Sequence, residues 1–402
     1  MGNCLVAQSG GPSAVINATI AGIVQANQAD PIYKKVLGGL NGIEGILNER
    51  FIDLTKMSDY ENRVLRQTPS SALGSCRYKL KRENVEDFKK IFAILDKYHI
   101  DTMFYTGGND SMDTVYALSE YAEKNGITNH RFVGCPKTVD NDLVETDHTP
   151  GFASAAKFIA TAVQHTWLDV NVYTREEVFI LETMGRDAGW LAASSVLSNH
   201  VDLLIVPEVP FNKEKFLKLV KDKVTKTHKC YIVVSEGARF ADGSYLAAGS
   251  AKNDGFGHAV LGGAGQALKE MILESKAASR CKVQELSTLQ RACGNMQSLV
   301  DVTESFRLGM SAHSHSHDPQ FTGYMVGLKR RPGKKYDAEF ITIPASKVAN
   351  FVKGFPKKWL KPNYAGVTQE GIDYLAPLIV GEPTVIYEKN GLPAYVEPYY
   401  LR

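Results

Sequence analysis

The sequence predicts an α/β protein with two lobes built on largely parallel sheets. Strand-like apolar runs alternate with segments of helical spacing, and two of the strands end in glycine pairs that open a helix. At 402 residues the chain exceeds the roughly 250–300 residues at which a single hydrophobic core stops growing. The alternation of strands and helices from about residue 150 to 275 indicates the second α/β lobe.

The composition is that of an ordinary globular protein, with 44% hydrophobic and 22% charged residues. The formal net charge of +2 provides no bulk attraction for nucleic acid or for a membrane surface. No apolar run approaches the ~18 residues of a membrane span, and the N-terminus does not resemble a secretion signal. The cysteines form no C-x-x-C pair, so we expect free thiols in a reducing cytoplasm. They are Cys4, Cys76, Cys135, Cys230, Cys281 and Cys293.

Two glycine turns have the same surroundings. Residues 102–106 resemble a strand that leads into the glycines at 107–108 and then a helix, and the N-terminus repeats this order with a strand at 4–7, glycines at 10–11 and a helix over 14–24. Glycines let backbone N–H groups approach a ligand, and the positive end of a helix attracts an anion. We expect both turns on one edge of a parallel sheet and predict a phosphate site there; a routine structural turn is the alternative.

Three elements lie between these turns. Residues 33–50 contain a short strand and a glycine-rich connection, and residues 83–98 form an amphipathic helix. Between them, the small-residue loop 68–77 ends in Arg77. Its guanidinium suits phosphate oxygens, and a solvated surface cation is the equal alternative.

Two carboxylates follow the next strand, at residues 131–135. Asp140 and Asp142 lie two residues apart, so they point the same way if the backbone stays extended. Close carboxylates repel, and a divalent cation or a proton relieves the repulsion. Magnesium with a phosphate fits better than calcium, whose loops supply more oxygen ligands. An Asx-rich turn is the structural alternative.

The second half of the chain continues the alternation and ends in a less regular region. We expect helices at 152–168 and 213–229, the latter with a solvated basic face, strands at 178–181, 203–206 and 231–234, and a strand-like run at 283–290 followed by a helix to about residue 311.

His313, His315 and His317 alternate with serine. On a strand they would share one face and could bind a metal, but no carboxylate or cysteine pattern completes such a site, so a polar loop is favoured.

Three short motifs, taken together, resemble the phosphofructokinases. They are Thr-x-Asp-Asn-Asp at 138–142, Met-Gly-Arg at 184–186 and Gln-Arg at 290–291, and they occur with the glycine turns but without a G-x-x-x-x-G-K-[ST] loop. The resemblance runs in order from Ala7 to about Asp301. It implies two Rossmann-like three-layer lobes and a C-terminal extension packed on them. The implied parts are a phosphoryl-donor lobe of residues 1–150 and about 285–330, a sugar-phosphate lobe of residues 151–284, and an extension of residues 331–402.

The resemblance implies roles residue by residue. Asp140 is the implied general base for the sugar's 1-hydroxyl, with Lys137 and Thr138 beside the transferring phosphoryl group. The implied donor-binding residues are Gly11, Arg77, Gly108, Asp110, Ser111 and Lys137. The implied fructose 6-phosphate residues are Thr138, Asp140, Met184, Gly185, Arg186, Glu236, Lys282 and Arg291. The implied neighbours of a Mg²⁺ ion are Asn109, Asp110 and Asp142.

Two positions resemble the pyrophosphate-dependent branch of the family. ATP-using relatives carry glycine where this chain has Asp110, and a carboxylate there occupies the space of the nucleotide and repels its α-phosphate. They generally also have glycine in place of Lys137, whose ammonium can compensate the charge of pyrophosphate.

The chain departs from the family pattern at three places. Asn109 stands where the family usually has Asp, and Thr288 replaces a sugar-site histidine. The arginine that a neighbouring subunit usually contributes has no match at the same position, Arg175 being displaced by two residues.

The resemblance therefore implies a cytoplasmic, magnesium-dependent phosphotransferase of glycolysis and gluconeogenesis that forms a homodimer or homotetramer. It would transfer a phosphoryl group reversibly from pyrophosphate to the 1-hydroxyl of fructose 6-phosphate, giving fructose 1,6-bisphosphate and phosphate. An ATP-dependent 6-phosphofructokinase and a non-catalytic regulatory subunit of the same fold are the alternatives.

Overall fold

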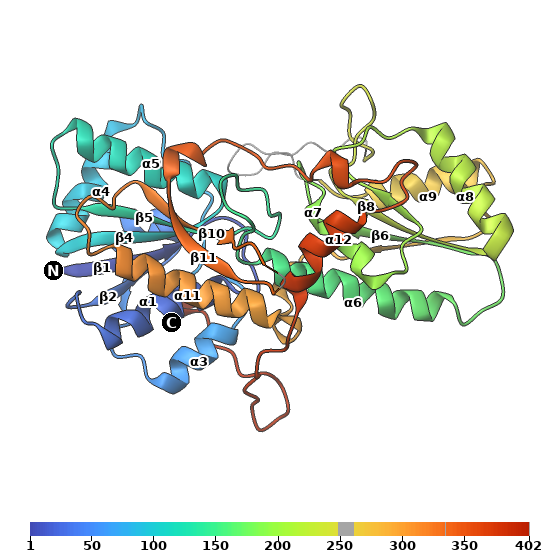
Figure 1. The fold of residues 1–402 in the computed structure, drawn as a ribbon. Helices are drawn as coiled ribbons and strands as arrows, with labels where there is room; N and C mark the ends of the chain where they lie inside the picture. Colours follow the sequence, from blue (N-terminus) through green and yellow to red (C-terminus); the bar gives the residue numbers. More distant parts are fainter. Residues whose placement is uncertain (248–260, 334, 402) are drawn as a thin grey trace.

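The computed structural model describes residues 1–247, 261–333 and 335–401, and this part of the chain forms two lobes that lie side by side (Figure 1). Each lobe is built on one β-sheet with helices on both of its faces. The prediction of two three-layer α/β lobes with largely parallel sheets is confirmed.

The first lobe contains a seven-stranded sheet in the order β11-β10-β5-β4-β1-β2-β3. Its central strands run parallel, and the edge strands β3 and β11 lie antiparallel to their neighbours. The strands are β1 (Asn3–Gln8), β2 (Val36–Gly39), β3 (Phe51–Asp53), β4 (Ile100–Gly107), β5 (Arg131–Pro136), β10 (Tyr324–Arg330) and β11 (Ala338–Pro344).

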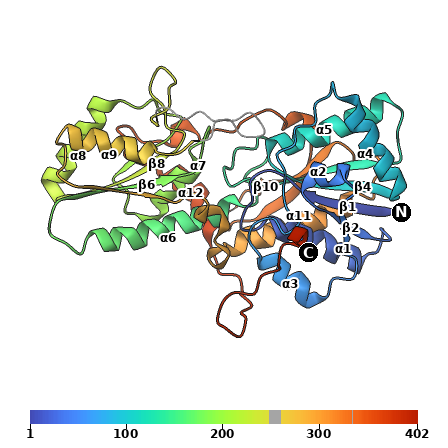
Figure 2. The same cartoon turned by 180° about the vertical axis from the view of Figure 1, so that it is seen from behind.

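Alternate residues of the central strands face two different helix layers (Figure 2). On one face, Val6 and Phe104 pack with residues of α1, α3 and α11; on the other, Leu5 and Met103 pack with α2, α4 and α5. The helices are α1 (Ile16–Ala29), α2 (Gly42–Leu47), α3 (Asp59–Gln67), α4 (Val85–Lys97), α5 (Asn109–Lys124) and α11 (Leu299–His315).

The second lobe contains a parallel four-stranded sheet in the order β7-β8-β6-β9. Leu181 and Val233 face α6 and α7, whereas Ile180 and Ile232 face α8 and α9. The elements are β6 (Glu177–Thr183), β7 (Leu203–Ile205), β8 (Lys229–Ser235), β9 (Cys281–Glu285), α6 (Phe152–Val170), α7 (Trp190–Ser194), α8 (Lys213–Thr227) and α9 (Ala264–Glu274). The short helix α10 (Leu289–Ala292) follows β9 and leads out of this lobe.

The C-terminal region contacts both lobes. β11 completes the edge of the first sheet, α12 (Gln369–Leu375) packs into the core of the second lobe through Leu375, and the N–H of Tyr399 returns to the first lobe to donate to Ala72. Short 3-10 helices occur at Ser195–Ser198, Gly294–Met296, Ala345–Lys347, Lys357–Trp359, Ala376–Ile379 and Tyr399–Leu401. In the described residues, no helix combines the length and the apolar character that a membrane crossing requires.

The predicted histidine loop is wrong for His313 and His315, because α11 continues to His315, whereas His317 lies in the turn that follows. His313 and His315 lie in the last turn of that helix, where residues two apart point in different directions. His313 is buried against Tyr33, with ring centroids 5.7 Å apart, and burial lowers its pKa to about 4. Within the described ranges, no cluster of three or more His, Cys, Asp or Glu side chains is arranged to hold a metal ion.

Two other local expectations were incomplete. The glycine-rich connection is partly regular, since Gly38 and Gly39 belong to β2 and Gly42 begins α2. Helix α3 was not predicted, although Ser58 and Glu61 form a capping box at its start.

Helices α1 and α11 pack closely because each has a glycine where they cross. A Cβ at Gly22 would lie 2.0 Å from the carbonyl oxygen of Phe306, and a Cβ at Gly309 would lie 2.1 Å from that of Thr19. Backbone atoms cannot move aside as a flexible side chain can, so a larger residue pushes the helices apart.

Gly22→Val and Gly309→Val should therefore each lower the free energy of unfolding by about 2 kcal/mol or more, since overpacking typically costs about 1–3 kcal/mol. Ser314→Val, at an exposed position of α11, is the control and should change it by less than about 1 kcal/mol. Urea denaturation followed by circular dichroism measures all three. Similar stabilities for the three variants would show that the crossing tolerates a side chain.

Candidate active site

The carboxyl ends of three neighbouring strands meet at one edge of the first sheet. Gln8 at the end of β1 pairs with Thr106 of β4, and Gly107 at the end of β4 pairs with Pro136 of β5. The prediction that both glycine turns leave the sheet at the same edge is confirmed, and the segment with the paired aspartates starts there too. Open parallel sheets bind ligands at this edge.

The first glycine turn is tied to the loop that ends in Arg77. Gly10 has a φ of 75°, which favours glycine. Its N–H donates to the carbonyl oxygen of Cys76 at 3.1 Å, and its carbonyl oxygen accepts from the hydroxyl of Ser75 at 2.6 Å. These bonds keep Arg77 next to the turn.

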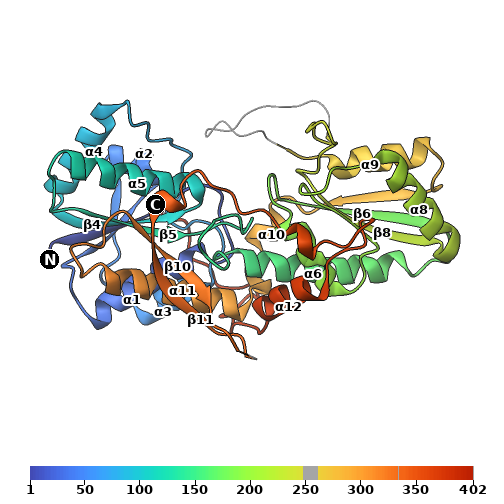
Figure 3. The same ribbon diagram turned by 45° about the horizontal axis from the view of Figure 1, so that its top comes forward.

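Two cations approach Gly11. The ammonium of Lys137 donates to the Gly11 carbonyl oxygen, and a Cβ at Gly11 would lie 2.9 Å from Nη1 of Arg291. A side chain at this position would make the Arg291 guanidinium shift away from the turn. Arg291 belongs to α10, which lies between the two sheets in Figure 3. The first glycine turn therefore contacts a residue that the family resemblance implies in binding fructose 6-phosphate.

The second glycine turn leads directly into α5. A Cβ at Gly107 would lie 1.9 Å from the hydroxyl oxygen of Ser111, so the turn closes tightly on the start of the helix. Gly108 is the N-cap residue, and no side chain caps the first N–H groups of α5. These N–H groups can bind an anion, while Asp110 adds a negative charge in the same turn.

The amide of Asn109 is engaged by the C-terminal region. Its Nδ2 donates to the carbonyl oxygens of Phe351 and, at 3.4 Å, Val348, and its Oδ1 accepts the N–H of Asn350 at 2.5 Å. Both ends of the amide thus bond backbone groups. Asn109 holds residues 348–351 in place, so its amide is already engaged and is not offered to a metal ion.

A left-handed turn separates the two aspartates. Asn141 has a φ of 53°, and its side-chain oxygen accepts the N–H of Thr149 at 3.0 Å. The backbone is therefore not extended between Asp140 and Asp142. An extended backbone was the condition under which we expected the two carboxylates to point the same way. The N–H of Asp140 donates to the hydroxyl of Thr138 at 3.2 Å, whereas Oδ1 of Asp140 is buried and has no hydrogen-bond partner in the part of the chain that the structure describes.

The electrostatic surroundings of Asp140 raise its basicity. Burial raises the pKa of Asp140, and the carboxylates of Asp142 and Glu236 raise it further, while Arg186 and Lys137 oppose the shift. Burial also raises the pKa of Asp142 and lowers the pKa of Lys137 to about 8. A carboxylate of raised basicity beside an ammonium suits the transfer of a proton from a neutral donor.

The second lobe brings a further group of predicted residues together. The N–H of Gly185, which has a φ of 126°, donates to Oε1 of Glu236 at 3.3 Å, and the Gly185 carbonyl oxygen accepts from the hydroxyl of Ser235 at 2.5 Å. The N–H of Met184 donates to the side-chain oxygen of Gln290 at 3.2 Å. Two of the three motifs of the family resemblance therefore meet here, and the third is near enough for Arg186 and Glu236 to act electrostatically on Asp140.

Glu236 is a partly buried carboxylate that faces open space. Burial raises its pKa to about 7, the bond from Gly185 opposes that shift, and the carboxylate of Glu182 adds to it. It lines a small pocket of about 60 Å³ together with Met184 and Thr183. A carboxylate in this position is suited to accept hydrogen bonds from hydroxyl groups.

Two predicted or discussed sugar-site positions lie outside this group, whereas Thr288 directly follows Ser287, which lines the pocket with Glu236. Lys282 of β9 forms an ion pair of 3.2 Å with Glu177, which is the first residue of β6. Met184 follows the last residue of β6, so Lys282 and Met184 lie at opposite ends of this strand. Arg175 is exposed and also precedes β6, and Thr288 is exposed at the start of α10. Within this chain, the structure does not bring Lys282 to the site.

Sequence reasoning missed several residues that join the lobes. Oε1 of Glu208 accepts the N–H groups of Gly189 at 2.8 Å and Phe355 at 2.7 Å, and the indole N–H of Trp190 donates to the carbonyl oxygen of Lys353 at 2.9 Å. None of these belongs to a motif, and Lys353 and Phe355 lie in the region without a regular pattern, so no sequence signal could have identified them.

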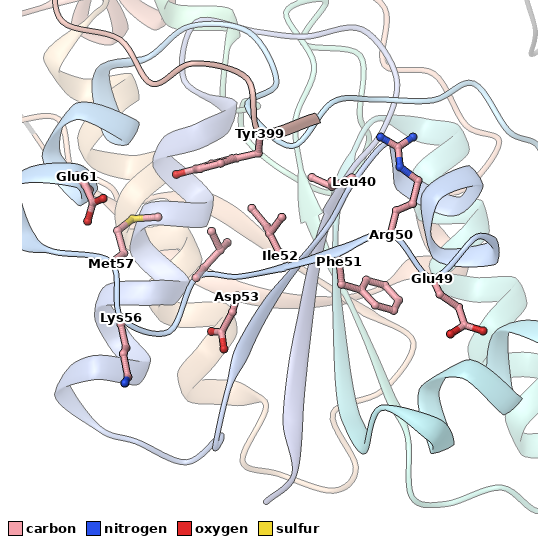
Figure 4. A pocket seen from close by; sticks show the side chains of 11 residues that line it. Leu40, Glu49, Arg50, Phe51, Ile52, Asp53, Lys56, Met57, Glu61 and Tyr399 are labelled. Carbon is pink, nitrogen blue, oxygen red and sulfur yellow. The ribbon is translucent and has the colours of Figure 1, made fainter. Parts of the chain in front are cut away.

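A larger pocket, of about 620 Å³, lies away from this site at the β3 edge of the first sheet (Figure 4). Phe51, Ile52 and Met57 line it, and no predicted site residue does. Its charged side chains have both signs, as Arg50 and Asp53 illustrate, so it offers no preference for an anionic ligand.

Comparisons with known proteins agree with the geometry. Residues 3–316 match the family model described as phosphofructokinase. The chain is 39% identical over 401 residues to the pyrophosphate–fructose 6-phosphate 1-phosphotransferase of Halomonas elongata, covering 97% of this chain and 94% of that protein. It is 37% identical over 404 residues to the protein of the same name from Xanthomonas campestris pv. campestris, covering 98% and 96%. The fold is similar to the crystal structure of the pyrophosphate-dependent phosphofructokinase of Nitrosospira multiformis, with a TM-score of 0.88, 34% identity and coverage of 99% of this chain and 96% of that chain.

The raised pKa of Glu236 predicts how the stability of this site varies with pH. Folding raises this pKa from 4.5 to about 7, so the folded state binds more protons than the unfolded state within that window and loses stability as the pH rises through it. Glu236→Gln keeps the oxygen that accepts from Gly185 but does not titrate. It should be more stable than the parent by about 1–3 kcal/mol at pH 8, and the difference should disappear near pH 4.

Urea denaturation at several pH values tests this expectation. Glu214→Gln, at an exposed position of α8, is the matched control, because it removes a carboxyl outside the site, and its effect on stability should change less between pH 4 and pH 8 than that of Glu236→Gln. A stability difference for Glu236→Gln that stays constant with pH would mean that this carboxyl has the same pKa in the folded and unfolded states.

Proposed function

The chain belongs to the phosphofructokinase family, and from this premise we propose that it transfers a phosphoryl group from pyrophosphate to the 1-hydroxyl of fructose 6-phosphate. The products are fructose 1,6-bisphosphate and phosphate. The observation that carries this proposal is the buried Oδ1 of Asp140, which has no partner among the described residues and belongs to a carboxyl that charged groups of both lobes influence.

Asp140 is the general base of the proposed reaction. The 1-oxygen of the sugar attacks phosphorus, the bond from phosphorus to the bridging oxygen of pyrophosphate breaks, and phosphate leaves while the hydroxyl proton passes to Asp140. In the loose transition state of phosphoryl transfer this proton leaves late, so positioning matters more than the strength of the base. The raised basicity that burial gives Asp140 assists the same step.

We assign the phosphoryl donor to the edge of the first sheet. Its anionic oxygens would bind the N–H groups at Gly11, Gly108 and the start of α5. The cations near this edge are Lys137, Arg77 and Arg291, whose charges act on one another. Ser111 and Thr138 supply hydroxyl groups beside them. This proposal makes residues 1–150 and about 285–330 the donor lobe.

We assign the sugar phosphate to residues of the second lobe that face Asp140. Glu236 would accept hydrogen bonds from sugar hydroxyls, and Met184, Gly185 and Arg186 would contact the sugar chain. Arg291 touches the donor turn in this structure and lies close enough to Asp140 and Glu236 to affect their charges, so it can bind a phosphate at either position.

Magnesium fits this arrangement, and we propose Asp142 as its protein ligand, with Asp110 as a second carboxylate nearby. Asp140 and Asp142 form a buried pair of like charges that a cation would relieve. Mg²⁺ usually keeps several waters and binds through one or two carboxylates and substrate phosphates, so it does not need a complete protein cage. When bound, the ion would neutralise negative charge on the diphosphate.

The proposal also covers the metabolic role of the reaction, the compartment in which the protein works and its oligomeric state. A pyrophosphate donor makes the step reversible, so it can serve both glycolysis and gluconeogenesis. The six cysteines are free thiols, as a reducing cytoplasm would keep them. We propose a homodimer or homotetramer in which the exposed Lys282 and Arg175 of one subunit reach the sugar phosphate of another.

A comparison of phosphoryl donors tests the proposed function. The purified chain is assayed with fructose 6-phosphate and either pyrophosphate or ATP, each with and without Mg²⁺. We expect turnover with pyrophosphate that depends on Mg²⁺. Efficient use of ATP and none of pyrophosphate would identify an ATP-dependent enzyme, and turnover with neither donor would indicate a regulatory subunit.

Asp140→Ser should lower kcat by several orders of magnitude with little change in fold, because it removes the group that accepts the hydroxyl proton. General base catalysis alone is worth about 10²–10⁴-fold, and loss of positioning adds to this. Steady-state kinetics with pyrophosphate measure the effect, and circular dichroism checks the fold. Asp59→Ser, at an exposed position in α3, is the control. A folded Asp140→Ser enzyme with the kcat of the parent would assign the base elsewhere.

Asp110→Gly should admit ATP, because it removes both the bulk and the charge of the side chain at the start of α5. We expect the ratio of kcat/KM for ATP to that for pyrophosphate to rise by about tenfold or more, a change of about 1.4 kcal/mol. Asp110→Asn keeps the bulk without the charge, so it separates the two causes. No gain in ATP use by either variant would place the choice of donor at other residues.

A further inference from the structure

A segment of the C-terminal region, residues 348–355, connects three parts of the active site, and we call it the strap. In Figure 1 it runs from beside α5 across to the second lobe. It follows β11 and the short helix Ala345–Lys347, and it has no regular secondary structure of its own. Its position is therefore fixed by the hydrogen bonds that it forms with other elements.

The strap begins at the helix of the second glycine turn. Asn109 holds its backbone at Val348, Asn350 and Phe351, as described above. The side-chain Nδ2 of Asn350 also donates to Oδ1 of Asp113 at 3.3 Å, one turn further along α5. The start of the strap is thus fixed to the helix that presents its N-terminus to the proposed donor.

Lys353, in the middle of the strap, contacts the loop that carries the two aspartates. Its backbone N–H donates to the carbonyl oxygen of Asp142 at 2.7 Å. Its ammonium donates to the carbonyl oxygens of Thr146 at 2.9 Å and Asp147 at 2.8 Å. One residue therefore holds the loop at Asp142 and again four to five residues later.

The charge of Lys353 also matches its surroundings. The carboxylates of Asp147 and Asp142 both stabilise the ammonium, which burial destabilises. A neutral side chain of similar length would leave the carbonyl oxygens of Thr146 and Asp147, and these carboxylates, without this cation.

The end of the strap is fixed to the second lobe. The carbonyl oxygen of Lys353 accepts the indole N–H of Trp190 at 2.9 Å, and the N–H of Phe355 donates to Oε1 of Glu208 at 2.7 Å. The Phe355 and Trp190 rings meet edge to face with centroids 4.9 Å apart. Lys353 thus joins the aspartate loop of one lobe to the first residue of α7 in the other.

We propose that Lys353 is a positioning residue for phosphoryl transfer, which holds the loop of Asp140 and Asp142 in its working geometry and ties it to the second lobe. This inference rests on the proposed function, because that function assigns the reacting groups to the loop. Lys353 itself bonds backbone carbonyls, so it acts through the loop and not on the substrate. Small displacements of reacting groups reduce rates strongly, so the effect belongs in kcat and not in KM.

Lys353→Met and Lys353→Arg test the proposal, with Lys347→Met as the matched control at an exposed position just before the strap. We expect Lys353→Met to lower kcat by about tenfold or more while KM for fructose 6-phosphate stays within about threefold, and Lys353→Arg to recover part of the loss. Lys347→Met should behave as the parent. Loss of kcat in Lys353→Met that is fully explained by unfolded protein, or a kcat equal to that of the control, would overturn the proposal.

Hydrogen–deuterium exchange provides a readout that does not depend on activity. The peptide that covers residues 138–148 should exchange several-fold faster in Lys353→Met than in Lys347→Met. Trp190→Phe removes the indole N–H that donates to the Lys353 carbonyl oxygen, a contact that Lys353→Met keeps, and it should also lower kcat because the strap loses a bond to the second lobe. Unchanged exchange in Lys353→Met would contradict a positioning role.

The parent protein separates this proposal from the proposed function. If the parent does not use pyrophosphate, the proposed function fails regardless of the strap. If the parent turns over pyrophosphate and Lys353→Met matches it in both kcat and exchange, the positioning role alone is wrong.

Discussion

The burial of an aspartate oxygen that has no hydrogen-bond partner among the described residues is the constraint on which this site depends. Leaving a buried polar atom unpaired costs about 1–3 kcal/mol, and more when the group is charged, so a fold retains it only where the surrounding structure determines its position. Around Asp140 this is achieved by the left-handed turn at Asn141 and by the cations Lys137 and Arg186. A hydroxyl group of a substrate that donates to Oδ1 of Asp140 would remove this unfavourable free energy.

The two lobes supply different halves of this environment. The first sheet ends in glycine turns whose N–H groups suit a diphosphate, and the second places Glu236 beside Gly185, where sugar hydroxyls can bind. Neither half is complete alone, since a phosphoryl transfer needs donor and acceptor in line. Arg291 next to Gly11, and the strap between α5 and Trp190, connect the halves with residues that are distant in sequence.

The sequence was informative wherever the signal was local. Strand, glycine pair and helix follow one another within about ten residues, and the spacing of Asp140 and Asp142 is visible directly, so the sheet edge and the proposed base could be predicted. Positions that depend on register or on long-range contacts could not. Lys282 lies at the far end of its strand, Asn109 is engaged by residues about 240 positions later, and Lys353 has no motif around it. The histidine repeat was misjudged because the helical pattern of α11 continues through polar residues.

A crystal structure with fructose 6-phosphate and the non-hydrolysable analogue methylenediphosphonate directly measures the distance between the 1-hydroxyl of the sugar and Asp140. The account predicts the 1-hydroxyl oxygen within about 2.6–3.2 Å of Oδ1 of Asp140, and the diphosphonate between that hydroxyl and the start of α5. A complex in which Asp140 bonds a protein group, while the 1-hydroxyl donates to a different residue, would contradict it.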